Sequence, residues 1–275
     1  MTQHRNPQAV QMADESMIRN LAAQANAIWP QESALFERYG LQGAIRVADI
    51  GCGTGEITAR LAQLYPQAQL VGVDILEPSI EYARRRYAEL GSRVQFAQGD
   101  AFELKFPDQS FDLVVCRHLT QALPEPEKVL AELYRVARPG GWLHVLSEDY
   151  GMLHMTPGLL DPDRLWHEGA ITFAHATGSD ARVGRRTAPM MQALGLEQLR
   201  VDYVVVDTLR VPRETFAAII LAWRDGYAQA FGDKTRLMPG EARALFDQVA
   251  ASILDPASYA VWQVPVIAGR KPEGK

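Results

Sequence analysis

Residues with the potential for ligand chemistry gather in one segment, Val47-Ala-Asp-Ile-Gly-Cys-Gly-Thr-Gly55, where an apolar run ends in glycines at positions 51, 53 and 55. Glycine permits a tight turn and lets a ligand approach the backbone, and the N-terminus of a following helix offers free N–H groups. The segment therefore predicts a strand, a binding loop and a helix. A plain strand-to-helix turn without a ligand remains the alternative for this motif alone.

Two aspartates strengthen the prediction of a ligand. Asp74 ends the next apolar run, and Asp100 follows a third one in Gln98-Gly-Asp-Ala101. A carboxylate at the end of the second strand can accept hydrogen bonds from both hydroxyls of a ribose. Either aspartate by itself could form an Asx turn or cap a helix. Both at neighbouring strand ends favour a binding crevice.

The elements that must position these residues alternate between strands and helices. The pattern predicts strands at 46–50, 69–73, 94–97, 111–116 and 142–147, and helices at 56–65, 78–90 and 126–136, with a turn at Pro139-Gly-Gly141. This alternation predicts an α/β fold, a doubly wound and mostly parallel sheet. Before it, residues 10–39 have helical periodicity, and Pro30 is expected to divide them into two short helices.

The pattern changes after residue 149. Residues 150–190 are rich in His, Met, Pro and Gly and predict a partly helical lid. Strands are expected at 198–209 and 259–269, with helices at 214–231 and 240–254 between them. We therefore expect one domain over 1–275, with a helical cover (10–39), a cofactor-binding core (40–149), the lid (150–190) and a helical insertion (210–258).

The ordered set of motifs resembles the class I S-adenosylmethionine-dependent methyltransferases. It consists of D-I-G-C-G-T-G, then V-D-I, G-D-A, F-D-L-V-V and R-P-G-G, all between residues 46 and 147. It is most similar to the small-molecule branch that includes the ubiquinone and menaquinone biosynthesis methyltransferases. The resemblance implies a Rossmann-like sheet of seven strands with an antiparallel last strand. It also implies S-adenosylmethionine as cofactor and S-adenosylhomocysteine as product.

The resemblance also implies roles for individual residues. The Gly51, Gly53 and Gly55 turn would pass the methionine part of the cofactor, with Asp49 helping to orient it. Asp74 would hold the ribose and Ile75 would flank the adenine. Asp100 would meet the adenine amino group, with Ala101 beside it. Arg117 would lie near the methionine end of the pocket.

Two rival functions stay open. The first is an oxidoreductase with an NAD-type cofactor, whose fingerprint G-x-G-x-x-G would need glycine where this chain has Glu56. An acidic residue opening the helix repels a pyrophosphate but suits the ammonium group of an amino acid. The second is a protein that binds the cofactor without turnover, and a methyltransferase for nucleic acid or protein is a further option.

Methyl transfer from a sulfonium is an in-line displacement, and a general base is needed only where the acceptor must lose a proton. Open α/β sheets bind ligands at the carboxyl ends of their strands. The candidates there are His118 after the fourth strand and Asp149 and His154 after the fifth, with Glu148 and Tyr150 beside them. For each, a solvated loop residue is the alternative.

Other residues carry weaker signals. His167 and His175 lack a metal-ligand spacing, so no metal is expected. Trp223 and Tyr227 belong to helix core or form an aromatic wall over the acceptor. The lid arginines Arg182, Arg185 and Arg186 either belong to a solvated loop or bind an anionic substrate group. The cysteines Cys52 and Cys116 either fill space in the core or form a reversible disulfide.

Composition limits the function classes. The 275 residues carry a formal net charge of −5, which disfavours binding to a phosphate backbone. Two cysteines without a C-x-x-C motif favour a reducing compartment. The N-terminal residues have no apolar signal-peptide core, and no apolar stretch reaches the length of a membrane helix. The expectation is a cytoplasmic methyltransferase with a small-molecule substrate and no nucleic-acid or membrane partner.

Overall fold

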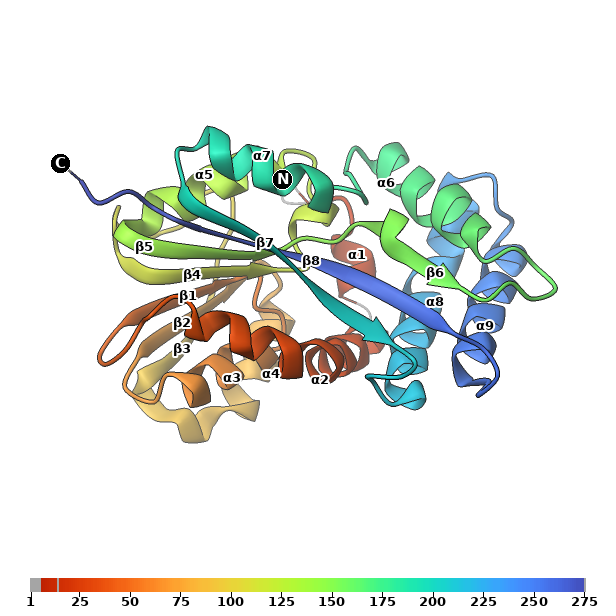
Figure 1. The fold of residues 1–275 in the computed structure, drawn as a ribbon, viewed down its shortest axis with the longest axis horizontal. Coiled ribbons are helices and arrows are strands. Elements are labelled where there is room, and N and C mark those ends of the chain that lie inside the picture. Colours follow the sequence, from red (N-terminus) through yellow and green to blue (C-terminus); the bar gives the residue numbers. More distant parts are fainter. Residues whose placement is uncertain (1–5, 14, 275) are drawn as a thin grey trace.

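The structure is a computed structural model that describes residues 6–13 and 15–274 (Figure 1). Residue 14, within the expected helical cover, and residues 1–5 and 275 lie outside the described residues. The strands are β1 Arg46–Ile50, β2 Gln69–Asp74, β3 Val94–Gln98, β4 Phe111–Arg117, β5 Ala137–Leu146, β6 Leu153–Met155, β7 Glu197–Asp207 and β8 Ala260–Arg270.

Helices connect and cover these strands. The α-helices are α1 Ala9–Met12, α2 Glu15–Glu37, α3 Glu56–Leu64, α4 Glu77–Arg86, α5 Pro126–Val136, α6 Thr172–Thr177, α7 Gly184–Ala193, α8 Arg213–Lys234 and α9 Pro239–Leu254. Short 3₁₀ turns lie at Ala88–Arg93, Thr120–Ala122 and Tyr150–Met152, and a π-helical turn spans Leu165–Ile171.

The strands form one sheet in the order β3-β2-β1-β4-β5-β8, with β7 on the outer side of β8. Pairs from β3 to β5 are parallel, while β8 runs antiparallel to both β5 and β7. This confirms the predicted doubly wound, Rossmann-like sheet. The short strand β6, which the sequence did not predict, pairs with the start of β8 beyond the end of β5.

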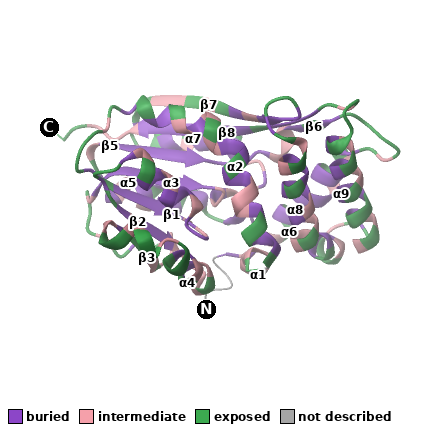
Figure 2. Cartoon of the chain, turned by 90° about the horizontal axis from the view of Figure 1, so that it is seen from below, coloured by how far each residue is buried: buried purple, intermediate pink, exposed green. Residues whose placement is uncertain are grey.

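Alternation along the central strands divides the core into two layers. Val47 and Leu113 face α2, α3 and α4, while Ala48 and Val114 face α5 and α7. A third apolar cluster lies at one end of the molecule, where α8, α9 and the π-helical turn pack against β6, β7 and β8 (Figure 2). The carboxyl ends of the parallel strands therefore face this third cluster.

Two local expectations were wrong. Pro30 does not divide the N-terminal helix, because it lies on the exposed side of α2, where water can reach the carbonyl of the equally exposed Asn26. The Pro139-Gly-Gly141 segment lies within β5 rather than in a separate turn. Its backbone stays paired, since Gly140 donates to the carbonyl of Lys271 and Lys271 donates to that of Gly141.

Helix α2 also covers the outer edge of the sheet. The Gln31 side chain donates to the carbonyl of Val205 (2.8 Å) and accepts from its N–H (3.1 Å), as a neighbouring strand would. Arg38 forms an ion pair with Asp202 on the same strand. These contacts hold α2 across β7, with its N-terminal half over the carboxyl ends of the strands. Across residues 6–13 and 15–274, no helix has the length and apolar character needed to cross a membrane.

Candidate active site

The glycine-rich turn connects β1 to α3. The N–H groups of Gly51 and Cys52 donate to the carbonyl of Val73, so the turn is tied to the end of β2. Gly53 has φ +52°, and a Cβ there would lie 2.7 Å from Cδ1 of Leu21 on α2. A side chain at this position would therefore be strained and would collide with the N-terminal cover.

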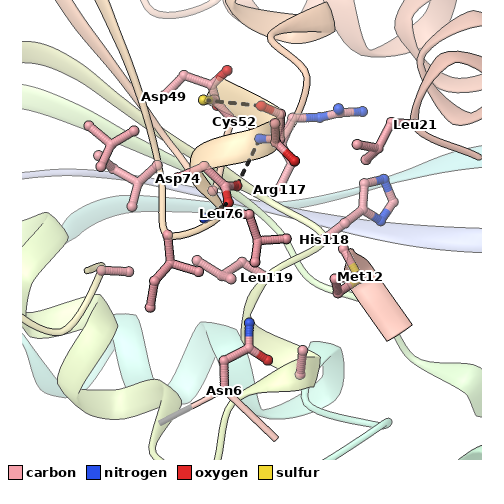
Figure 3. Close-up of a pocket in the computed structure, with 18 of the residues that line it drawn as sticks. Asn6, Met12, Leu21, Asp49, Cys52, Asp74, Leu76, Arg117, His118 and Leu119 are labelled. Atoms are coloured by element: carbon pink, nitrogen blue, oxygen red, sulfur yellow. Dashed lines mark hydrogen bonds between the residues drawn. The ribbon is translucent and has the colours of Figure 1, made fainter. Parts of the chain in front are cut away.

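Asp74 fixes the same turn from β2. Its Oδ2 accepts from the Gly53 N–H and its Oδ1 from the Leu76 N–H, both at 2.9 Å (Figure 3). Burial raises the pKa of Asp74, although these backbone N–H groups oppose the shift. Each carboxylate oxygen keeps a second acceptor site, because an ionised carboxylate offers about four. Asp74 can therefore bind ribose hydroxyls without releasing the turn.

Asp49 lies in the last part of β1, beneath the turn. Its side chain is buried, and Oδ2 accepts a 2.6 Å hydrogen bond from the Thr58 hydroxyl. Burial raises the pKa of Asp49 to about 6, against the opposing effects of Thr58 and Arg117. A buried carboxylate with an elevated pKa favours a cationic ligand group, which would restore its ionised form.

Arg117 ends β4 and is held from behind by a buried network. Its Nε donates to Oε1 of Glu32 on α2 (2.8 Å), and the same oxygen lies 2.9 Å from His144 Nε2, whose Nδ1 lies 2.7 Å from the Tyr39 hydroxyl. Burial alone would raise the pKa of Glu32, but Arg117 and His144 hold it at about 2. Arg117 Nη2 is buried and has no hydrogen-bond partner in the described part of the chain.

These residues surround a cavity of about 1110 Å³, solvent at its mouth included. All the predicted cofactor residues line it except Gly55, which instead caps the N-terminus of α3 with φ +81°. Lining residues that the sequence did not single out come mostly from the N-terminal segment and from the loops after β2 and β3: Asn6, Met12, Leu21, Gln24, Leu76 and Phe102. The apolar residues among them have the spacing of ordinary core, and Asn6 and Gln24 belong to no motif, so the sequence held no separate signal for them.

The chemistry of this lining fits S-adenosylmethionine. Asp74 offers acceptors for a ribose, and Ile75, Leu76 and Phe102 offer apolar surface for an adenine ring. The unpartnered Nη2 of Arg117 suits a carboxylate, while Asp49 and Glu56 suit an ammonium group. Each charged end of an amino acid thus finds an opposite charge.

A second cavity of about 700 Å³ adjoins the first. The two share Met12, Leu21, Gln24, His118 and Ala122 in their linings. One part of its wall is aromatic and comes from the loop after β5, the lid, α8 and α9: Tyr150, Trp166, Phe173, Trp223, Tyr227, Phe231 and Phe246. Polar side chains such as Gln8, Asn20 and Gln121 line another part. Trp223 and Tyr227 therefore pack in the helical core and also line a cavity.

His118 lies at the junction of the two cavities. Its Nδ1 is 2.6 Å from Oε1 of Glu148, and the two side chains are only 9% and 3% exposed. Nε2 of His118 is buried, and no described residue forms a hydrogen bond with it. His118 also has φ +51°, a left-handed conformation that is uncommon for a residue with a side chain.

The other predicted catalytic residues lie elsewhere. Asp149 is fully buried beside the loop, where it binds Arg185 Nε (2.6 Å) and the Gly151 N–H, and it lines neither cavity. His154 is exposed on β6. The structure therefore brings only His118 of the three to the junction. Glu148, rather than Asp149, is its neighbour, because successive residues of the chain leaving β5 point in different directions.

The remaining sequence signals have structural explanations. Arg185 and Arg186 form ion pairs with Asp149, Asp180 and Glu127. Cys52 and Cys116 are free thiols in apolar clusters on opposite faces of the sheet, so they do not form the disulfide considered above. Among residues 6–13 and 15–274, no group of His, Cys, Asp and Glu is arranged to hold a metal ion.

The part of the chain that carries the motifs is similar to known proteins. Residues 47–141 match a family model described as a methyltransferase domain. A demethylmenaquinone methyltransferase from Thermus thermophilus is 41% identical over 102 residues, which is 37% of this chain and 46% of the relative. A sterol 24-C-methyltransferase from Aspergillus fumigatus is 38% identical over 118 residues, 42% of this chain and 31% of the relative.

The similarity identifies residues 47–141 as a methyltransferase domain. The chain matches less than half of the length of these curated relatives. Solved structures extend the similarity of fold beyond the methyltransferase domain model. A phosphoethanolamine N-methyltransferase from Haemonchus contortus aligns with TM-score 0.63 and 21% identity over 99% of this chain and 61% of its own.

Fold similarity at this identity does not specify the reaction. A chain described as a [4+2]-cyclase aligns with TM-score 0.57 and 22% identity over 88% of this chain and 80% of its own. The residues around the two cavities, rather than the sheet of the methyltransferase domain, must therefore carry any argument about the acceptor.

Proposed function

We propose that this protein transfers a methyl group from S-adenosylmethionine to a small molecule. The observation that carries the proposal is the junction of two unlike cavities at His118. One is lined by the glycine-rich turn and the carboxylates of Asp74 and Asp100, and the other by aromatic side chains. A cofactor and an acceptor in adjoining cavities can meet within one enclosed space.

The bound cofactor would supply an electrophilic methyl group on a sulfonium, so the protein needs mainly to bind, orient and exclude water. Asp74 would bind the ribose, and Asp100 with Ala101 would line the adenine side. Gly51 and Gly53 would let the methionine part approach the backbone, with Gly55 setting the start of α3. Asp49 and Arg117 would bind its charged ends.

We further propose that different segments of the chain bind the cofactor and the acceptor. Residues 40–149 would bind the cofactor, and the cover at 10–39, the lid at 150–190 and the insertion at 210–258 would enclose the acceptor. All three enclosing segments contribute to the aromatic cavity through residues such as Leu21, Trp166 and Trp223. Such enclosure favours a small, partly apolar acceptor over nucleic acid, and a cytoplasmic location stays the expectation from composition.

Glu56 supports this proposal over an NAD-type oxidoreductase. It opens α3 and lines the first cavity, where a dinucleotide would place its pyrophosphate. The carboxylate would repel that group but attract the ammonium of a methionine moiety.

Calorimetric titration tests the proposal. We expect saturable one-site binding of S-adenosylmethionine and of S-adenosylhomocysteine, and no binding of NAD⁺ at the same concentration. Incubation with S-adenosylmethionine and a library of small acceptors should then release S-adenosylhomocysteine. Binding of NAD⁺ alone would support the oxidoreductase, and cofactor binding with no acceptor in a broad library would support a protein without turnover.

A further inference from the structure

The environment of His118 restricts the chemistry of the acceptor. Glu148 Oε1 accepts from Nδ1, which leaves Nε2 as the free ring nitrogen of a side chain that lines both cavities. A histidine oriented by a carboxylate in this way can take a proton at Nε2, and the carboxylate then stabilises the imidazolium. Nothing in the described residues competes for that nitrogen.

The groups facing this pair come from several elements. Trp262 of β8 lies beside the His118 ring, at 6.0 Å between centroids. The titratable groups that line the same cavity are Glu148, Tyr150 and Tyr227, and Arg117 precedes His118 in the chain. Burial, followed by the nearby charge of Glu148, raises the pKa of Tyr150 well above its usual range. Tyr150 thus stays protonated, and His118 is the base available at the junction.

We propose that His118, positioned by Glu148, is the general base for O-methylation of a hydroxyl group on an aromatic ring. This inference rests on the function proposed above. The hydroxyl proton passes to Nε2 of His118. An oxygen lone pair forms the new O–CH₃ bond as the C–S bond of the sulfonium breaks, which leaves the neutral thioether, and the proton later leaves His118 for solvent.

The geometry favours oxygen over nitrogen as the acceptor atom. After losing its proton, a phenolate keeps more than one lone pair, so it can accept a hydrogen bond from Nε2–H and still attack the methyl group. A neutral amine attacks through its single lone pair before it loses a proton, so its methylation does not require a base in that step. A thiol depends less on such a base, because its pKa of about 8.5 leaves a few per cent of it ionised near neutral pH, far more than of a phenol with a pKa of about 10.

The aromatic ring of the acceptor follows from the walls of the second cavity. Trp166, Trp223 and Tyr150 have ring centroids within 5.6 to 6.3 Å of one another, and the two tryptophans pack edge to face. Planar rings gain from offset and edge contacts with such walls. Besides His118 Nε2 and Glu148 Oε2, three further buried polar atoms on this lining have no partner among the described residues and suit polar substituents on the ring: Asn20 Oδ1, Gln121 Oε1 and Trp166 Nε1.

The test uses two phenols, 2-naphthol and 7-hydroxycoumarin, with the whole 275-residue chain. In the presence of saturating S-adenosylhomocysteine, we expect both to bind and to quench tryptophan fluorescence. Bound 7-hydroxycoumarin should show the absorption of its anion at a pH where the free dye is neutral. With S-adenosylmethionine, mass spectrometry and NMR should identify the methyl ether. Naphthalene and coumarin, which lack the hydroxyl group, should bind more weakly.

Variants assign the roles. His118→Asn should lower kcat by about 100-fold or more and abolish the anion spectrum. Glu148→Gln should lower kcat less and move the acid limb of the kcat/KM profile to lower pH, while Glu148→Asp should restore part of the rate. His175→Asn changes an exposed histidine on α6 and serves as the matched control. S-adenosylhomocysteine affinity shows whether each variant is folded.

Clear results would overturn the inference. One is that neither phenol binds while S-adenosylhomocysteine does. Another is that the protein methylates amine or thiol probes in place of the phenols, or methylates a ring carbon. The last is a His118→Asn rate within about threefold of wild type. If His118→Asn does not fold, an unchanged pH profile of kcat/KM in Glu148→Gln would also overturn the inference. Loss of S-adenosylhomocysteine binding by the wild-type protein would instead contradict the proposed function itself.

Discussion

The backbone N–H of Gly53 donates to Oδ2 of Asp74 across 2.9 Å, so the glycine-rich turn and the carboxylate at the end of β2 form one unit. The same unit lies beneath Leu21 of α2, which approaches Gly53 from the N-terminal cover. Cofactor binding and closure of the cover are therefore connected through a few atoms, and the predictions below follow from these contacts and from the buried charges behind them.

Asp74→Ala should weaken S-adenosylmethionine binding at least tenfold, a loss of about 1.4 kcal/mol. The change removes the ribose acceptor and also frees the Gly53 and Leu76 N–H groups. Calorimetric titration measures the loss. Asp161→Ala, on the exposed loop after β6, is the control and should bind like wild type. An Asp74→Ala affinity within twofold of wild type would place the ribose elsewhere.

Asp49 should make cofactor binding depend on pH. Its folded-state pKa of about 6 lies above the ordinary aspartate pKa of 3.8, so the free protein gains a proton as pH falls through 6. An ammonium group favours the ionised form, and binding at pH 5 should therefore be about tenfold weaker than at pH 7 and should release a proton.

Titrations in buffers with different ionisation enthalpies measure the proton released. Asp49→Asn removes the titrating group, so this variant should bind S-adenosylmethionine weakly at both pH values and release no proton. The raised pKa also has a consequence for stability: because the folded state holds this proton more tightly, the contribution of Asp49 favours folding below pH 4 and declines as pH rises through 6. Proton release that persists in Asp49→Asn would assign the effect to another group.

Glu32→Ala should destabilise the fold by about 3–5 kcal/mol, because it leaves Arg117 buried without its ion-pair partner. Urea unfolding monitored by tryptophan fluorescence measures the change. The pKa of Glu32 is held at about 2, below the ordinary glutamate pKa of 4.5, so its contribution to stability is complete above pH 4.5 and is lost as pH falls toward 2. The wild-type protein should lose stability over that range.

Glu32→Ala should show a smaller acid-dependent loss than wild type over the same range. Glu37→Ala, at the exposed end of α2, is the comparison variant and should stay within about 0.5 kcal/mol of wild type. Equal acid sensitivity of Glu32→Ala and wild type would show that other carboxylates control acid unfolding.

Gly53→Ala should destabilise the protein by about 1–3 kcal/mol and weaken cofactor binding, because φ is +52° and the new Cβ meets Leu21 at 2.7 Å. A double-mutant cycle with Leu21→Ala separates the two causes. Removing the leucine side chain relieves the collision but not the backbone strain, so the double variant should lose less than the sum of the single losses. Strict additivity would mean that α2 does not press on the turn.

The sequence by itself determined the sheet, because its signals are local. Continuous apolar runs such as Phe111–Cys116 and the glycines after Ile50 fix a strand or a turn by short-range chemistry, whatever lies around them. Gly53 and Asp74 could likewise be assigned to one crevice, since parallel strands place their carboxyl ends at the same edge.

Only the tertiary structure decided what lies opposite that crevice. His118, Glu148, Trp166 and Trp223 come from distant parts of the chain, and their meeting depends on how the lid and α8 pack over β8. Met12 and Leu21 have the spacing of ordinary core residues, and Pro30 appeared to end a helix that continues. Side-chain packing between remote segments has no periodic trace in a sequence, so the order of motifs predicted the cofactor crevice but not the second cavity beside it.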